Sequence, residues 1–237
     1  FKKGYDNSKR LFLVTKLLSI HTSKPTVNST LPSHCNVLSS DDLENTKLSN
    51  VDDIHCNDKA HKKQRTSIFV TWLLDIYGKE YLNSGSGVID IAGGKGAISW
   101  ELQCIHGIKC TLLDPRTVNL SGKQKKYLRK MNREKFNHHQ IALHTPESDK
   151  NAIDALDIND LFKNSSLLIG MHPDEATDAI LEYACYYQKP LAIVPCCVYA
   201  EVFTHRKIAD KPVLTYENLL NYLQFYPHNP LQRISLP

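Results

Sequence analysis

Two acidic residues on either side of a glycine turn have the types and the spacing that nucleotide binding requires. Asp90 lies in the apolar run 88–92, which reads as a buried strand, and the turn 93–96 (GGKG) follows it. A helical pattern and a second short apolar run come next, and they end on Asp114. A glycine turn lets the backbone approach a ligand at a helix N-terminus, and an acid after the second strand can hydrogen-bond ribose hydroxyls. The stretch therefore predicts a nucleotide-binding βαβ unit.

The same residues resemble a known cofactor motif. Motif I of class I S-adenosylmethionine (SAM) methyltransferases reads [DE]-x-G-x-G-x-G, and this chain has Asp90-x-Ala92-x-Gly94-x-Gly96, with alanine at the first glycine position. In that family the acid and the turn hold the methionine end of SAM, and the acid after the second strand holds the ribose. The resemblance implies these cofactor-binding residues: Asp90, Ala92, Gly93, Gly94, Gly96, Asp114 and Pro115.

Two other interpretations of the turn remain open. A dinucleotide-binding domain would carry G-x-G-x-x-G, a spacing that this turn does not have. A tight turn in an α/β domain without any cofactor is the second alternative.

A later segment narrows the resemblance to one branch. Residues 171–178 (MHPDEATD) are similar to the H-L-C-G-x-A-T-D stretch of eukaryotic methyltransferases related to the tRNA acceptor-stem 2′-O-methyltransferase. His172 and the run Ala176-Thr177-Asp178 match, whereas Pro173-Asp174-Glu175 replaces Leu-Cys-Gly. Those proteins also have a Cys-Cys element after the fifth strand, as Cys196-Cys197 stands here. The resemblance covers residues 60–200 and implies RNA as the methyl acceptor.

Three residues are candidates for the chemistry of methyl transfer. His172 could act as the base for a hydroxyl or amine nucleophile, with Asp174 orienting it. The alternative is that His172 and Asp178 cap the following helix and link the strand ends. Cys196 offers a rival reaction, in which a thiolate attacks carbon five of cytosine. RNA enzymes of that type carry a second Pro-Cys where this chain has His-Pro-Asp, and cysteines at strand ends most often serve in packing.

Strands that alternate with helices predict a Rossmann-like α/β fold of the class I methyltransferase type, with a mainly parallel sheet and helices on both faces. Ligands gather at the carboxyl ends of such strands, which would put Gly94, Asp114, His172, Asp174 and Cys196 on one rim. The C-terminal strand hairpin of complete class I enzymes is expected to be missing. The expected strands are 88–92, 109–113, 138–144, 166–171 and 190–194, and the expected helices are 59–78, 97–106, 154–162, 175–188 and 215–225.

Two basic segments predict RNA as a partner, through phosphate pairing and counterion release. A net charge of +4 permits an anionic partner without demanding one. For each segment the alternative is an ordinary solvated helix. The first segment contains Lys59, Lys62, Lys63 and Arg65, and the second contains Lys123, Lys125, Lys126, Arg129, Lys130, Arg133 and Lys135.

The composition suits one substantial core, because the chain has 237 residues of which 41% are hydrophobic. Residues 1–58 are expected to form a partly loop-like N-terminal extension, and 59–237 the SAM-binding domain. Within the extension, 11–20 reads as a strand or a short helix. The chain begins with Phe1 rather than Met, so its true N-terminus is expected to be missing or processed.

The cysteine pattern indicates an intracellular protein, cytoplasmic or mitochondrial, because seven scattered cysteines do not form a disulfide framework. No apolar run approaches the roughly 18–20 residues that span a bilayer, so no membrane partner is predicted. The pairs His34-Cys35 and His55-Cys56 lack the usual zinc-ligand spacing, and no metal site is predicted.

Two functions follow from these patterns. The first is a SAM-dependent methyltransferase that acts on tRNA or rRNA. The second is a catalytically silent, methyltransferase-like component of a ribonucleoprotein such as a ribosome. Ala92 in place of glycine and the missing hairpin suit the second function, whereas retention of Asp90, Gly94, Gly96 and Asp114 argues for the first.

Overall fold

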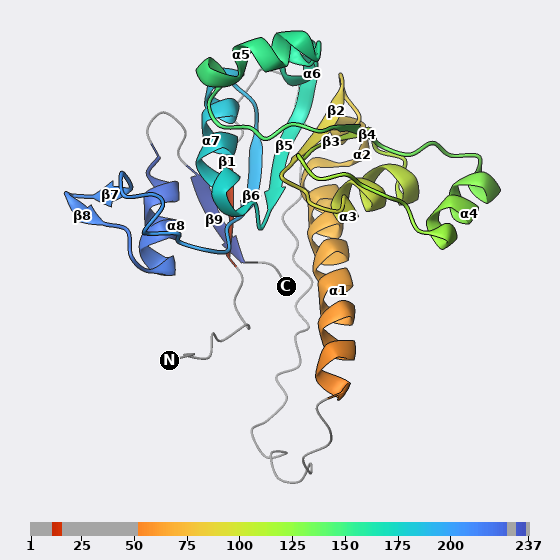
Figure 1. Ribbon diagram of the computed structural model, residues 1–237, viewed down its shortest axis with the longest axis horizontal. Coiled ribbons are helices and arrows are strands. Elements are labelled where there is room, and N and C mark those ends of the chain that lie inside the picture. Colours follow the sequence, from red (N-terminus) through yellow and green to blue (C-terminus); the bar gives the residue numbers. More distant parts are fainter. Residues whose placement is uncertain (1–10, 16–51, 227–230, 236–237) are drawn as a thin grey trace, which may run out of the picture.

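Seven strands form one sheet in the computed structural model, which describes residues 11–15, 52–226 and 231–235 (Figure 1). The strand order is β4-β3-β2-β5-β6-β1-β9, and the five strands from β4 to β6 are parallel. β1 runs antiparallel to β6, and β9 runs antiparallel to β1. The strands are β1 (Leu11–Thr15), β2 (Gly87–Ile91), β3 (Cys110–Leu113), β4 (Asn137–His139), β5 (Ser165–Met171), β6 (Leu191–Val194) and β9 (Leu231–Ser235).

The central strands are buried along their whole length because helices cover both faces of the sheet. All residues of β2, β3 and β6 are buried, as expected of parallel strands with two covered faces. Successive side chains point to opposite faces, so that Val88 packs on one side and Ile89 on the other. The predicted α/β class, with parallel strands and helices on both faces, is confirmed.

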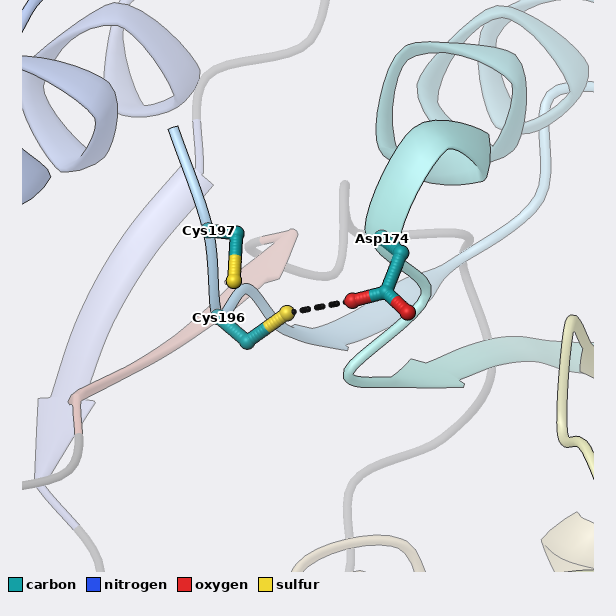
Figure 2. A group of neighbouring side chains, drawn as sticks. All are labelled: Asp174, Cys196 and Cys197. Carbon is teal, nitrogen blue, oxygen red and sulfur yellow. Dashed lines mark hydrogen bonds between the residues drawn. The ribbon is translucent and has the colours of Figure 1, made fainter. Parts of the chain in front are cut away.

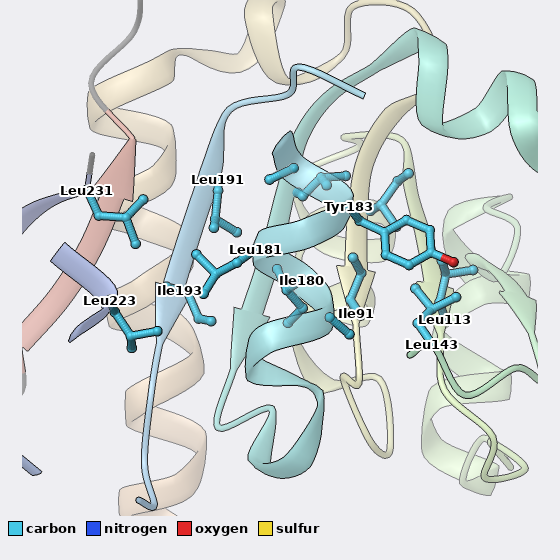
Figure 3. Close-up of a cluster of buried hydrophobic side chains, with 14 of the residues drawn as sticks. Ile91, Leu113, Leu143, Ile180, Leu181, Tyr183, Leu191, Ile193, Leu223 and Leu231 are labelled. Carbon is cyan, nitrogen blue, oxygen red and sulfur yellow. The ribbon is translucent and has the colours of Figure 1, made fainter. Parts of the chain in front are cut away.

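The helices divide between the two faces. On the face of Val88, the core forms against α1 (Asp52–Tyr77), α2 (Lys79–Leu82) and α3 (Ala97–Ser99), which continues as the π-helix η1 (Trp100–Ile105). On the face of Ile89, it forms against α5 (Pro146–Ala155), α6 (Asn159–Asn164), α7 (Thr177–Tyr186) and α8 (Tyr216–Gln224) (Figure 3). A smaller cluster beside β3 holds α4 (Gly122–Met131).

The helix after the glycine turn differs from its predicted geometry. The sequence places Ile98, Leu102 and Ile105 on one apolar face, and the first two are buried. Ile105 is 40% exposed, because the second half of the helix is a π-helix and its longer turn rotates the last residues away from that face.

The segment after β4 contains two helices where the sequence predicted one helix over 154–162. Thr145 begins α5 with a hydrogen bond from the Ser148 amide to its Oγ1, and Pro146 follows as the first helical residue. Asp157 has a φ of 51°, and this left-handed residue separates α5 from α6. β4 is also shorter than the predicted strand 138–144.

The expected absence of a C-terminal strand hairpin meets a different arrangement, because among the described residues a single strand follows α8 and it pairs with a strand from the N-terminal segment. β9 follows α8, and β1 from the N-terminal segment lies between β6 and β9. β1 falls within the predicted extension 1–58, and α1 crosses the predicted boundary because it begins at Asp52. The rest of the extension, with the pair His34-Cys35, lies outside the described residues.

The chain between β6 and α8 is held on α7 by a buried ion pair. Arg206 is 1% exposed, and its Nη2 lies 2.9 Å from Oδ1 of Asp178. Its Nη1 donates to the Val198 carbonyl oxygen, and its guanidinium covers the Phe203 ring at 3.7 Å from the centroid. Asp178 therefore has a structural role, and the short hairpin β7 (Lys207–Ile208) and β8 (Lys211–Pro212) follows this anchor.

Candidate functional site

The carboxyl ends of β2, β3, β5 and β6 meet at one edge of the sheet, where a pocket of about 370 Å³ opens. The predicted residues Ala92, Asp114, Pro115, His172 and Asp174 all line it. Arg116, Ile141, Glu175 and Tyr199 add to the wall, and the sequence reading singled out none of these four for the site.

The turn after β2 takes left-handed backbone conformations at alternate positions. φ is 55° at Ala92, 61° at Gly94 and 69° at Gly96. The resemblance expects a glycine at the position of Ala92, and the positive φ explains that preference, because alanine is strained there. The turn keeps its shape despite the replacement.

Gly93 covers the Asp90 carboxylate. A Cβ on Gly93 would lie 2.4 Å from the Asp90 Oδ2, so any side chain at this position would displace the acid. A Cβ on Gly96 would lie 2.5 Å from the Phe136 ring, which gives this glycine a packing role. The turn is thus built to bring its backbone directly over a buried acid.

Asp90 is a fully buried acid with half of its hydrogen-bonding capacity unused. Its Oδ2 accepts a hydrogen bond of 2.7 Å from the Ser99 hydroxyl, whereas Oδ1 has no partner among the described residues. Burial raises its pKa to about 6, although the Ser99 hydrogen bond opposes this. A buried, unpaired carboxylate oxygen is costly, and it would be satisfied by a cationic ligand group.

Asp114 connects the glycine turn to Arg116 through hydrogen bonds. Its Oδ2 accepts a 2.7 Å hydrogen bond from the Gly94 amide, and Arg116 donates to both carboxylate oxygens. Burial raises the pKa of Asp114, but the hydrogen bonds from Arg116 and Gly94 outweigh this effect and leave it below its ordinary value. Asp114 is therefore ionised near neutral pH and accepts hydrogen bonds, which is the state that ribose hydroxyls require. Ribose would have to share these oxygens with Arg116, whose side chain is 71% exposed.

The residues of this edge fit the cofactor that the resemblance implies. The orphaned Asp90 Oδ1 lies beneath Gly93 and outside the pocket lining, and it would suit the ammonium end of a methionine moiety that reached it. Ionised Asp114 lines the pocket and would suit a ribose. Gly93 and Gly94 leave the backbone above the acid bare of side chains. The fit thus rests on three features: the Asp90 oxygen that has no hydrogen-bond partner, the ionised Asp114 carboxylate, and the glycines of the turn, which carry no side chains.

The three predicted catalytic residues lie close together beyond the turn. Asp174 accepts a 2.8 Å hydrogen bond from the Cys196 thiol, so its carboxylate is engaged with the cysteine (Figure 2). His172 borders the pocket, its amide donates to the Val194 carbonyl oxygen, and its φ is 52°. Left-handed φ values at His172 and Asp174 on either side of Pro173 mark a strained turn, of the kind that functional sites keep.

The environment of Cys196 does not favour the thiolate. Burial and the neighbouring Asp174 carboxylate raise the pKa of this thiol well above its ordinary value. A cysteine nucleophile requires a lowered pKa, so the geometry gives no support to attack by Cys196 on a cytosine ring.

The second basic segment is only partly available to a partner. Arg133 donates to the carbonyl oxygens of Cys104 and Ile105, and Lys135 donates to that of Val118, so both cations have structural roles. Five cations on α4 are exposed, and no ion pair among the described residues engages them: Lys123, Lys125, Lys126, Arg129 and Lys130. The side chains of 59–63 in the first segment lie outside the described residues.

Within the described part of the chain, no helix combines the length and the apolar character that a membrane span needs. Comparisons of the chain with protein-family models, with curated proteins and with solved structures find no match.

Proposed function

We propose that the chain binds SAM at the β2–β3 edge and transfers its methyl group to RNA. The observation that carries the proposal is the pair of acids around the turn. Asp90 offers a buried, unpartnered oxygen beneath Gly93, and Asp114 is joined to the same turn through the Gly94 amide. The two acids would thus provide a group for the ammonium of the methionine moiety and a group for the ribose, which are two parts of SAM.

The residues around the pocket would have separate roles in methyl transfer. When bound, SAM supplies an electrophilic methyl group on a sulfonium. Ala92 and Pro115 border the pocket beside the turn and would help to orient the cofactor. His172 stands in the same wall and would accept the proton of the attacking hydroxyl or amine. Asp174 remains hydrogen-bonded to Cys196, so it would act on the neighbouring turn rather than on the acceptor.

RNA as the acceptor is supported by the charge of α4. Its five exposed cations have no acidic neighbour within the helix, whose sequence is GKQKKYLRKM. Cations without local partners release counterions when they meet a phosphate backbone, and this release drives binding.

The test is calorimetry of SAM binding to the whole chain. Asp114→Asn keeps the shape of the acid but removes its charge, and Gly94→Asp adds a side chain at a left-handed position that contacts Arg116. Micromolar binding by the wild type, weakened at least about ten-fold in both variants (about 1.4 kcal/mol), supports the proposal. Asp160→Ala is the control. This exposed acid lies in α6, which leads into the N-terminal end of β5, whereas the pocket lies at the carboxyl ends of the strands.

A silent, SAM-free component of a ribonucleoprotein is the second candidate, and one observation favours it. Arg116 already fills the acceptor positions of Asp114. A folded wild type that gives no binding heat with SAM but binds RNA would replace the enzyme proposal with this one.

A further inference from the structure

Three side chains beyond the ends of β5 and β6 gather into a cluster that does not contact the acceptor or the cofactor in the proposed methyl transfer. Asp174 follows β5, and Cys196 and Cys197 follow β6 (Figure 2). One carboxylate oxygen and the two sulfur atoms all lie within 4.8 Å of one another. Asp174 and Cys197 are exposed and Cys196 is half-buried, so the cluster is accessible from solvent.

We propose that Asp174, Cys196 and Cys197 bind one Zn²⁺ or a similar thiophilic divalent cation. Two thiolates and one carboxylate are ligands that Zn²⁺ prefers, and three protein ligands leave a fourth position for water or another ligand. A tetrahedral ion with Zn–S bonds of about 2.3 Å would hold the two sulfurs about 3.8 Å apart. The cluster therefore needs only a small contraction to close on an ion.

The backbone already directs these groups toward one another. Met171 pairs with Val194 in the parallel ladder, and the His172 amide extends the pairing by donating to the Val194 carbonyl oxygen at 2.9 Å. Beyond this point Asp174 takes a φ of 49°, a left-handed conformation that non-glycine residues adopt uncommonly. This conformation occurs at a residue whose carboxylate faces the two thiols, as a preorganised ligand would be.

The protonation states can be followed through binding. Without a metal, Cys196 is a thiol that donates a hydrogen bond to the Asp174 carboxylate. A divalent cation would take up both thiolates and the carboxylate, and two protons would leave to solvent. Affinity is therefore expected to rise with pH. The proposal does not depend on SAM, because none of the three residues belongs to the glycine turn or to Asp114.

The sequence did not indicate this site, since adjacent cysteines do not have the C-x₂-C spacing of common zinc sites. Asp174 lies 22 residues before Cys196 in the chain, and the pairing of β5 with β6 brings the acid to the two cysteines.

Titration of the 237-residue chain with Co²⁺, which takes the place of Zn²⁺, tests the proposal. Cys35→Ser and Cys56→Ser form the background, because each of these cysteines adjoins a histidine that offers a competing ligand. With a non-thiol reductant present, we expect one Co²⁺ per chain, a thiolate-to-cobalt charge-transfer band in the near ultraviolet, and loss of that band when Zn²⁺ is added.

Matched variants assign the signal to the cluster. Cys197→Ser changes an exposed residue and should remove part of the charge-transfer band, and Asp174→Asn should keep the band but weaken affinity at least about ten-fold. Cys185→Ser changes a half-buried cysteine on α7 and should leave both the band and the affinity unchanged.

A folded background protein without a thiolate band, or a band that persists at full strength in Cys196→Ser and Cys197→Ser, would overturn the proposal. Because the readout contains no SAM, failure of the metal site and failure of methyl transfer are distinguishable.

Discussion

At the scale of single residues, Asp90 is an acid that the fold removes completely from water. Its carboxyl group is fully buried, and burial raises its pKa to about 6 from the ordinary 3.8. The folded protein therefore holds this proton more tightly than the unfolded chain does. The resulting stabilisation is fully present below pH 3.8 and is lost as the pH rises through about 6.

Asp90→Asn should remove this dependence. An amide resembles the protonated acid, so we expect the free energy of unfolding at pH 8 to exceed that of the wild type by up to about 3 kcal/mol, from a shift of roughly two pKa units. Below pH 4 the two proteins should unfold at nearly the same urea concentration. Urea denaturation across this pH range measures the difference, with exposed Asp160→Asn as the control. A difference that is equal at both ends of the range would contradict this account of Asp90.

Ala92 provides a second prediction for a single residue. Its φ of 55° strains an alanine, and glycine would relieve that strain while giving the unfolded chain more freedom. Ala92→Gly is therefore expected to leave the stability unchanged or raise it by about 0.5–1 kcal/mol. The same substitution at Ala152, an exposed position inside α5, should cost about 1 kcal/mol. Thermal unfolding of the two variants compares them directly, and equal losses would argue against strain at Ala92.

At the scale of elements, the second basic segment has two kinds of cation: some make structural hydrogen bonds, and the others, on α4, are exposed. Arg133 and Lys135 lie just beyond the helix and hold backbone carbonyl groups, whereas the cations on the helix face solvent. Ser121 caps its N-terminus by accepting a hydrogen bond from the Gln124 amide. A capped, rigid helix with unpaired cations is well suited to contact phosphates.

Replacing Lys125 and Lys126 with Gln should weaken RNA binding at every sequence tested. Each phosphate contact that is lost should lower the slope of log affinity against log salt by about 0.7 for single-stranded RNA. Filter binding at several salt concentrations gives this slope. Lys163→Gln with Lys211→Gln removes the same net charge elsewhere on the surface, and it should leave the slope unchanged. A loss of slope as large in this control would locate the RNA surface away from α4.

At the scale of the whole molecule, the two ends of the described chain complete the sheet together. β1 pairs with β6 on one side and with β9 on the other, so the C-terminal strand reaches the sheet only through the N-terminal one. The stability of β9 is therefore expected to depend on residues that lie more than 200 positions away in the chain.

Leu13→Pro tests this dependence, because Leu13 pairs with Ile193 and with Arg233, and proline removes a backbone donor from an inner strand. We expect a melting temperature several degrees lower and loss of hydrogen-exchange protection in β9, with protection kept in β2 and β5. Leu13→Ile keeps the donor and should behave as the wild type. Unchanged protection of β9 in the proline variant would contradict this pairing.

Local patterns predicted much of the fold and of the turn. Apolar runs predicted β2, β3, β5 and β6 within a residue or two, and the predicted helix 215–225 matches α8, where the Thr215 Oγ1 accepts a hydrogen bond from the Asn218 amide. The glycine spacing placed Asp90 under the turn and Asp114 opposite it, because a strand, a tight turn and a helix leave the chain few other paths. These features depend on neighbours in sequence, which periodicity and turn chemistry record.

The remaining features depend on contacts between segments that lie far apart in the chain, so local patterns do not record them. Nothing in residues 11–15 specifies β6 and β9 as partners, and nothing near Arg116 indicates that its guanidinium fills the Asp114 oxygens. The state of Asp90 follows from burial by the whole fold, and the meeting of Asp174 with Cys196 and Cys197 follows from the parallel pairing of β5 with β6. Local patterns were enough to place particular chemical groups at the ends of the strands. The order of the strands determined which of those groups meet, since neighbouring parallel strands end at the same edge of a sheet.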